Sequence, residues 1–403
     1  MARRFTWISG GVTAARGFRA SGVHAGVKRS RKPDLALVVC ELPATAAAVF
    51  TRNRVQAAPV LISKGRVRRG MARAVLINSG CANCLTGAQG FQDALRLGRA
   101  VAKRLHLAEV EVLLASTGLI GSRLPVSRME RAIPLLVNQL SRAHHEDAAQ
   151  AILTTDLHVK EAAVQAVIGG RLCRLGGMAK GSGMIAPSMA TMLCVLTSDV
   201  GIAPGLLRNL VQGAAERTFH RMSVDGDMST NDTVFALASG RSGVTIRPGT
   251  SSARTCAAML EAVSARLAGL LVADGEGASR VMEVRVMGAR TEQDAQACAR
   301  QVACSPLVKT MLAGHDPNVG RIAAAVGASP ARFDPKRLEI RIGSHRVVSQ
   351  GAALPLTKSV SRRLLNHPEV SVRIHLHAGR AEGRMVTCDF TEEYVRINAR
   401  YST

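Results

Sequence analysis

The stretch Gly176–Val200 reads GGMAKGSGMIAPSMATMLCVLTSDV and joins a glycine-rich segment to an apolar one. Its glycines surround one cation, Lys180, and glycine permits positive φ or close approach of backbone to a ligand. Thr191 opens the apolar run Met192–Leu196, which is long enough for a buried strand. A threonine at the start of a core strand would be held on a rigid element, as catalysis requires. Composition alone favours a plainer interpretation, a glycine-rich turn followed by an ordinary buried threonine, because a lone glycine-rich loop is a weak signal.

The particular residues of this stretch favour the catalytic interpretation over the plainer one. Lys180–Leu193, KGSGMIAPSMATML, resembles the self-cleavage segment of the ornithine acetyltransferase family, also called glutamate N-acetyltransferase. In that family the bond before the threonine breaks autocatalytically, and the freed threonine becomes the nucleophile. The resemblance implies cleavage at Ala190–Thr191, into an alpha chain of residues 1–190 and a beta chain of residues 191–403. It also implies an α/β fold with β-sheets sandwiched between helix layers, in a self-cleaving enzyme with an N-terminal threonine nucleophile.

A second segment suggests an oxyanion hole. The expected strand at residues 111–115 runs into Ser116–Gly121, STGLIG. A strand that ends in Thr-Gly can present a hydroxyl and a backbone N–H to one point, where they would stabilise a developing negative charge. Thr-Gly after a strand is far more often only a turn. The match to the STG-x-IG segment of the family reverses that preference, and it implies Thr117 and Gly118 as the oxyanion residues.

Further segments resemble substrate-contacting parts of the family. The resemblance implies substrate contacts by Thr154, Lys180, Thr191, Glu276, Asn398 and Thr403. On spacing alone, a polar helix end at residues 154–156 and an exposed turn acid at Glu276 are the simpler interpretations. The register of the TTD segment leaves Thr155 as the alternative to Thr154.

The segment Ser223–Thr233, SVDGDMSTNDT, alternates acids with small residues. It lacks the glutamate of an EF-hand loop, so we do not expect calcium. It resembles a family segment that reads VDGDTSTNDT, and its acids are expected to complete a hydrogen-bonded turn near the site. The chain departs from the family pattern at Cys81, Met228 and Val319, where asparagine, threonine and tryptophan are usual.

Strand and helix patterns alternate along the chain, which favours an α/β fold. No internal repeat or low-complexity linker divides it, and 403 residues fit one large domain or two. Strands are expected at residues 35–39, 46–50, 111–115, 192–196, 282–286, 338–342, 372–376 and 385–390. Helices are expected at residues 91–105, 206–221 and 252–271. A further helix is expected to open with a capping box at Ser127–Glu130, to restart at Pro134 and to continue towards Ile152. Another is expected to be capped by Thr291.

Composition bounds the remaining possibilities. No uncharged apolar run reaches 18 residues, and the first residues lack the apolar core of a secretory signal, so we expect no membrane span and a cytoplasmic location. The 9 cysteines are odd in number and scattered, which suits reduced thiols. Cys81 and Cys84 have the spacing of half a zinc site, but no second pair follows, so no metal is expected.

The net charge of +24 would normally suggest a nucleic-acid partner. The basic residues are spread over the whole chain, no nucleic-acid motif accompanies them, and stacking aromatics make up only 3%. We therefore expect a solvated arginine-rich surface without a specific nucleic-acid site.

The resemblance implies acetyl transfer from Nα-acetyl-L-ornithine to L-glutamate through acetyl-Thr191, as in cyclic arginine biosynthesis. Lys180 would pair with a substrate carboxylate and Glu276 with the ornithine ammonium. No cofactor is expected, and use of acetyl-CoA as a second donor is left open. The cleaved chains are expected to associate as an α₂β₂ heterotetramer. A self-processing aminopeptidase or amidohydrolase of similar fold is the alternative; a basic nucleic-acid-binding protein would leave the motifs unexplained.

Overall fold

The computed structural model describes residues 5–186, 192–316 and 318–400, which form two compact units. Unit 1 comprises the described residues of Met1–Gly181, Ser188–His220 and Met228–Leu271; unit 2 comprises those of Ser182–Pro187, Arg221–Asp227 and Val272–Thr403. Each unit therefore contains chain from both sides of the predicted cleavage point. Ala190–Thr191 itself lies outside the described residues, and the division into residues 1–190 and 191–403 stays a prediction.

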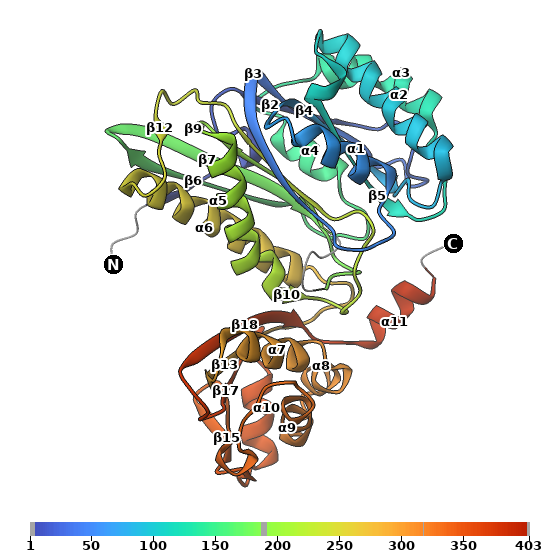
Figure 1. Cartoon of the computed structure of the whole chain (residues 1–403). Helices are drawn as coiled ribbons and strands as arrows, with labels where there is room; N and C mark the ends of the chain where they lie inside the picture. The colour runs from blue at the N-terminus through green and yellow to red at the C-terminus, as the bar shows by residue number, and fades with distance from the viewer. Residues whose placement is uncertain (1–4, 187–191, 317, 401–403) are drawn as a thin grey trace. The chain divides into compact units, whose positions relative to one another are not determined.

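A nine-stranded sheet forms the centre of unit 1 (Figure 1). Its order is β1-β6-β7-β8-β11-β3-β4-β5, with β2 paired to β3. The strands are β1 Thr6–Ile8, β2 Phe18–Val23, β3 Leu35–Phe50, β4 Met71–Cys81, β5 Val112–Leu119, β6 Lys160–Ile168, β7 Arg171–Lys180, β8 Leu193–Ser198 and β11 Thr233–Ala238. A separate pair consists of β9 Gly201–Ile202 and β12 Thr245–Ile246. Strands β8 and β11, which follow the predicted cleavage point in sequence, lie between β7 and β3, which precede it.

Strand β3 is continuous, although the sequence predicts two strands at residues 35–39 and 46–50. Strands β2 and β11 pair with successive parts of β3, and β4 pairs with its other edge. The register to β4 shifts between Val39 and Ala44, and Pro43 lies within this irregularity. The prediction of two strands is therefore wrong, because a bulge accommodates the missing N–H of the proline inside one strand.

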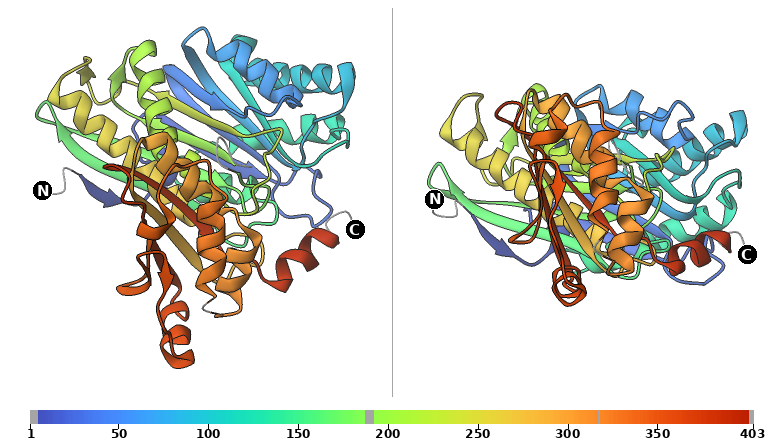
Figure 2. Two further views of the ribbon diagram at one scale, coloured as in Figure 1. Left: turned by 60° about the horizontal axis from the view of Figure 1, so that its bottom comes forward. Right: turned by 90° about the horizontal axis from the view of Figure 1, so that it is seen from below.

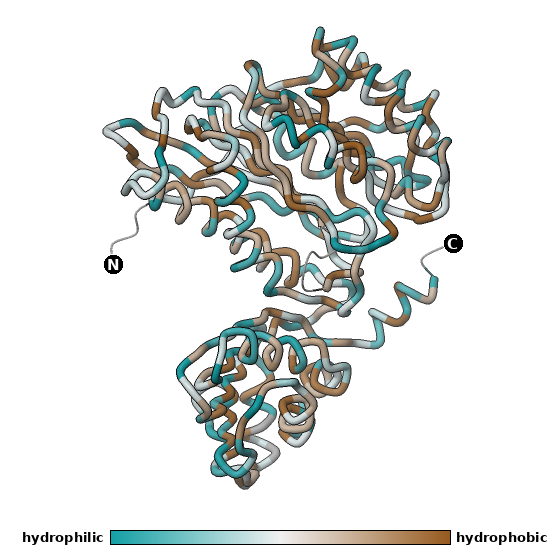
Figure 3. Tube along the Cα trace, viewed as in Figure 1, coloured by the Kyte–Doolittle hydropathy of each residue, from teal (hydrophilic) through white to brown (hydrophobic). Residues whose placement is uncertain are grey.

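Helices cover both faces of this sheet. They are α1 Ala58–Val67, α2 Gly87–Leu105, α3 Val126–Asn138, α4 His145–Ala151, α5 Pro204–Arg217 and α6 Ser251–Ala273. Ala36 and Val38 of β3 share a core cluster with Ala148 of α4, whereas Leu35 and Leu37 share another with residues of α2 and α3. Successive strand residues point to opposite faces, so the two clusters lie on opposite sides of the sheet. In Figure 3 the strands between them are mainly hydrophobic. The predicted α/β class with helix layers is confirmed.

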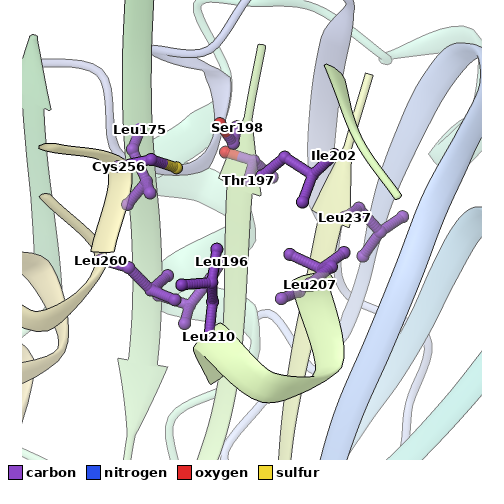
Figure 4. Close-up of a pocket in the computed structure, with 11 residues that line it drawn as sticks. Leu175, Leu196, Thr197, Ser198, Ile202, Leu207, Leu210, Leu237, Cys256 and Leu260 are labelled. Atoms are coloured by element: carbon purple, nitrogen blue, oxygen red, sulfur yellow. The ribbon is translucent and has the colours of Figure 1, made fainter. Parts of the chain in front are cut away.

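Helix α6 is long and apolar enough, by length and composition alone, to cross a membrane. Half of its most apolar window is nevertheless buried in the fold. Cys256 and Leu260 of α6, Leu207 of α5 and Leu196 of β8 line one apolar void of about 10 Å³ (Figure 4). Such a void is about the smallest that could hold a water molecule. The contacts are those of a core helix packed on a sheet.

The predicted course of residues 127–152 is wrong at three points: the capping box, the restart at Pro134 and the continuation towards Ile152. Helix α3 begins at Val126, with Pro125 at its N-cap and no side-chain cap hydrogen bond, so Ser127 opens no capping box. The helix runs through Pro134 and ends at Asn138, and α4 begins separately at His145. Between the two helices, Ser141 exchanges backbone hydrogen bonds with Ala20 of β2. This tertiary pairing removes Ser141 from any continuous helix.

Unit 2 is built on a seven-stranded sheet with the order β10-β18-β13-β17-β14-β15-β16. The strands are β10 Met222–Ser223, β13 Val281–Ala289, β14 Glu339–Ile342, β15 His345–Ser349, β16 Ala352–Ala353, β17 Glu369–His375 and β18 Ala381–Cys388. The helices are α7 Glu292–Ala303, α8 Pro306–Ala313, α9 Val319–Gly327, α10 Lys358–Leu365 and α11 Glu392–Ala399. The predicted strands of this half are confirmed, and so is the cap: Thr291 Oγ1 accepts the N–H of Asp294 at 3.0 Å.

One face of this second sheet packs on helices. Val284 of β13 and Ile340 of β14 share a core cluster with Cys298 of α7 and Ile322 of α9. Figure 2 shows helices α7–α9, in orange, gathered on one side of the strands. The alternation of buried and exposed residues along β13 and β17 follows from this one-sided packing.

Candidate active site

The glycine-rich stretch begins as a strand, not as the loop that the sequence predicts. Gly176 and Gly177 lie inside β7. A methyl group on Gly176 would lie 1.9 Å from the carbonyl O of Gly11, and one on Gly177 would lie 2.7 Å from Cδ2 of Leu196. These glycines therefore allow close packing on both faces of β7 rather than a turn.

Strands β7 and β8 bring the two ends of the predicted self-cleavage segment together. Lys180 is the last residue of β7, and its pairing partner is Leu193, the first residue of β8. The segment between them contains Ala190 and Thr191, which lie outside the described residues. Cleavage and the nucleophilic role of Thr191 stay predictions.

Met192, the residue after the predicted nucleophile, is held at both of its peptide groups. Its N–H donates to Oδ1 of Asp232 at 3.2 Å, and its carbonyl accepts the N–H of Thr233 at 3.0 Å. Asp232 is 1% exposed, and burial raises the pKa of its carboxyl well above the usual value. The sequence predicts that acids of this segment complete hydrogen-bonded structure, and Asp232 does so.

Thr117 and Gly118, the predicted oxyanion pair, lie at the end of β5 beside the parallel strand β4. Gly118 pairs with Gly80 and has φ of 124°. A methyl group on Gly118 would lie 2.4 Å from the carbonyl carbon of Gly80, so a side chain is excluded here. The preceding carbonyl, of Ser116, accepts a hydrogen bond from Asn231 at 2.8 Å. The predicted pair is therefore placed on a rigid strand end.

Three of the predicted site residues meet around the ammonium of Lys180. This side chain is 2% exposed. Its Nζ donates to Oγ1 of Thr154 at 2.7 Å and to Oγ1 of Thr117 at 3.4 Å. Residues from the end of β5, the segment after α4 and the end of β7 thus form one hydrogen-bonded cluster in unit 1, and the choice of Thr154 over Thr155 as a substrate contact stays a prediction.

The carboxylate of Asp156, which the sequence analysis did not single out, carries the negative charge of this cluster. It lies 2.7 Å from Nζ of Lys160 and 3.6 Å from Nζ of Lys180, and it accepts the N–H of Gly181 at 2.6 Å. Burial alone would raise its pKa, but the charges of Lys180 and Lys160 outweigh burial and hold the pKa below its usual value. The spacing of an acid and a lysine four residues apart was the available signal.

Two further predicted residues meet within unit 2. Asn398 of α11 donates through Nδ2 to Oε2 of Glu276 at 2.8 Å. Glu276 is 8% exposed, and its N–H donates to the carbonyl of Ser182 at 2.8 Å. Gly277, the next residue, has φ of 68°, a conformation that favours glycine. Thr403 lies outside the described residues.

Asp225 supports the same part of unit 2. Its carboxylate accepts the N–H groups of Met184 at 2.5 Å and Ile185 at 2.8 Å, and the hydroxyl of Tyr394 at 3.3 Å. Burial and the negative charge of Asp225 raise the pKa of Tyr394. Tyr394 was missed because its partner lies far away in sequence.

Comparison with known proteins identifies the family of this chain. A family model described as the ArgJ family matches residues 19–403. This chain belongs to the ArgJ family. It is 43% identical over 415 residues to the arginine biosynthesis bifunctional protein ArgJ of Thermosynechococcus vestitus. This alignment covers 98% of the present chain and 99% of the relative. The chloroplastic ArgJ of Sorghum bicolor is 45% identical over 407 residues, 98% of this chain and 88% of the relative.

Among solved structures, the chain is similar to the ornithine acetyltransferase from Mycobacterium tuberculosis complexed with ornithine. The sequence identity is 40%, and the TM-score is 0.43. The match covers 47% of this chain and 100% of that chain.

The three residues that depart from the pattern expected by resemblance have the following surroundings. The thiol of Cys81 contacts the carbonyl O of Ser122 at 3.1 Å. The carbonyl of Met228 accepts a hydrogen bond from Asn53 at 3.0 Å, a contact that any residue could make. Val319 packs in the core cluster of unit 2.

Asp156→Asn should destabilise the protein, because it leaves two buried lysines without their counter-charge. We expect a loss of about 3–5 kcal/mol in the free energy of unfolding, measured by chemical denaturation at pH 7. The native pKa of Asp156 is lowered, so its contribution is complete above about pH 4 and is lost as the pH falls towards the native pKa. The difference between wild type and variant should therefore narrow in acid.

Asp147→Asn is the matched control, because Asp147 is an exposed carboxylate on α4. It should change the free energy of unfolding by less than about 0.5 kcal/mol. Equal stabilities of the two variants would contradict the assignment of Asp156.

Proposed function

We propose that this chain transfers acetyl from Nα-acetyl-L-ornithine to L-glutamate through an acetyl-Thr191 intermediate. The observation that carries the proposal is the cluster in which Thr117 and Thr154 share the ammonium of Lys180, at the end of the strand that leads to Thr191. Support comes from full-length relatives named as arginine biosynthesis bifunctional proteins, and from a similar protein described as ornithine acetyltransferase complexed with ornithine.

The first step is self-cleavage. The hydroxyl of Thr191 attacks the carbonyl carbon of Ala190, the C–N bond breaks, and the nitrogen takes the proton, which leaves an ester. Water then hydrolyses the ester, releases residues 1–190 with a free carboxylate, and restores the hydroxyl. The new α-amine has an ordinary pKa of about 7.7–8.0, which suits a general base at neutral pH.

The acetyl transfer has two halves. Thr191 Oγ attacks the acetyl carbonyl of the donor while the α-amine takes its proton, and Thr117 and Gly118 stabilise the oxyanion. The amine passes the proton to the departing nitrogen of ornithine. In the second half, the amine of glutamate attacks acetyl-Thr191, the same groups act again, and the hydroxyl is regenerated.

The substrate contacts belong to the same proposal. Lys180 and Thr154 contact the substrate in unit 1, and Glu276 binds the ammonium of the ornithine side chain. Asn398 supports this role, since its hydrogen bond orients the carboxylate of Glu276. Thr403 contributes a further contact near the end of the chain.

The assembly and location also remain part of the proposal. We infer an α₂β₂ heterotetramer of the cleaved chains, no cofactor, and a cytoplasmic location. Relatives from Sorghum bicolor and Oryza sativa are named as chloroplastic. Acetyl-CoA as an additional donor to glutamate is compatible with the same acetyl-Thr191 intermediate.

Purified protein should consist of two fragments, the second starting at Thr191. Thr191→Ala should remain a single chain and should be inactive, because it lacks the hydroxyl that attacks Ala190. Intact mass and N-terminal sequencing measure both outcomes. An active enzyme that is uncut, or that is cut at another bond, would overturn the cleavage mechanism.

Thr117→Ala should lower kcat by about 10²–10³-fold, the usual effect of removing one oxyanion donor. Thermal unfolding should change little, since the variant removes one hydroxyl at a strand end. The measurement is kcat of the fully cleaved variant, because incomplete cleavage would also lower the observed rate. An unchanged kcat would remove Thr117 from this role.

Initial rates with both substrates varied should give parallel double-reciprocal lines, because ornithine departs before glutamate reacts. Acetyl groups should accumulate on the second fragment when glutamate is withheld. Intersecting lines would indicate direct transfer instead. Acetate release that does not depend on glutamate would indicate the alternative, a self-processing hydrolase.

A further inference from the structure

The covalent structure of the substrates determines where a carboxylate must lie. In Nα-acetyl-L-ornithine the α-carboxyl carbon is three bonds from the acetyl carbonyl carbon that is attacked. Glutamate reacts through the amine on the carbon that also carries its own α-carboxylate. An anion therefore lies next to the oxyanion pair in both halves of the reaction, and a cation there would form a charge-assisted hydrogen bond.

Lys180, the predicted cation for this carboxylate, already has partners in the protein. Its ammonium donates to Thr154 and lies 3.6 Å from the carboxylate of Asp156. Asp156 is shared with Lys160, so one carboxylate serves two lysines. Because Lys180 is already engaged by these groups, a second cation nearer to solvent would bind the substrate carboxylate more readily.

Lys28, in the loop between β2 and β3, lies at the same edge of the sheet. A methyl group on Gly80 would lie 3.0 Å from Cγ of Lys28, so the stem of this lysine lies against Gly80. Gly80 is the pairing partner of Gly118, half of the predicted oxyanion pair. Nζ of Lys28 donates to the carbonyl of Pro33 at 2.6 Å, and in the described part of the chain the lysine forms no ion pair.

The charges around Lys28 leave one positive charge uncompensated. Burial lowers the pKa of Lys28 to about 8; Asp34 and Asp156 act against this lowering, and Lys180 adds to it. Of the lysines that are buried or half-buried, Lys28, Lys160 and Lys180 face the two carboxylates of Asp34 and Asp156, and the exposed Lys32 also lowers the pKa of Lys28. Burial raises the pKa of Asp232, whose carboxylate is engaged by the N–H of Met192 and not by a lysine in the described residues. At neutral pH, one monoanion would balance the cluster.

We propose that Lys28 binds the α-carboxylate of both amino-acid substrates, an inference that rests on the proposed function. The stem of this half-buried lysine lies against Gly80, the pairing partner of Gly118, and the substrate carboxylate would share its ammonium with the carbonyl of Pro33. Lys180 then serves chiefly to organise Thr117, Thr154 and Asp156. Lys28 could not be recognised from local pattern, because only folding of the loop between β2 and β3 places it against Gly80.

The test compares ornithine with putrescine, which is the same diamine without the carboxylate. Isothermal titration calorimetry on the full-length enzyme gives the dissociation constant of each. Lys28→Met retains an unbranched stem but removes the charge, and it should weaken ornithine binding by about 10-fold or more. Putrescine binding should not change. Lys28→Arg should retain most of the affinity for ornithine.

Lys32→Met is the matched control, because Lys32 is an exposed lysine of the same loop. It should leave both dissociation constants unchanged. Unchanged ornithine binding by Lys28→Met would overturn the inference, and so would equal losses for ornithine and putrescine, which would indicate a structural role. If wild-type enzyme transfers acetyl while Lys28→Met binds ornithine normally, the proposed function stands and only this inference fails.

Discussion

The buried carboxylate of Asp156 is the interaction on which the candidate site depends. A lysine as buried as Lys180 is tolerated only with a counter-charge and hydrogen-bond acceptors. Asp156 supplies that charge to Lys180 at the end of β7 and to Lys160 at the start of β6. It also accepts the N–H of Gly181, so the same group determines how the chain leaves the sheet. One side chain thus compensates the charge of two lysines and holds the first residue after β7.

The acid-rich segment before β11 provides a second support. Asn231 joins the chain after β4 to the end of β5 through the carbonyls of Ala82 and Ser116. Its neighbour Asp232 holds the N–H of Met192. Two adjacent side chains thus reach both the strand end that carries Thr117 and the residue that follows Thr191. An active site for acyl transfer needs this fixed relation, because misplacement of about 1 Å is costly.

Much of the fold could be predicted from local pattern. The errors share one cause, which is contact between residues far apart in the sequence. Alternation of apolar residues located the strands of unit 2, and Thr291 located a helix start. The break between α3 and α4 depends on Ser141 pairing with Ala20, and the unbroken β3 depends on β2, β4 and β11. Likewise, motif resemblance pointed to Thr117 and Lys180, but Asp156 and Tyr394 acquire their roles only through partners brought together by folding.

The strand order of unit 1 has a consequence for how such an enzyme can be made. Strands β8 and β11 are central, and their outer neighbours β7 and β3 come from the other side of residue 190. A gene divided at codon 191 would yield one polypeptide with a gap in the middle of its sheet and another in which β8 has lost β7 and β11 has lost β3. Unpaired strand edges of this kind promote aggregation. Scission would therefore have to come after folding, because only the intact precursor keeps β7, β8, β11 and β3 in one chain while they pair.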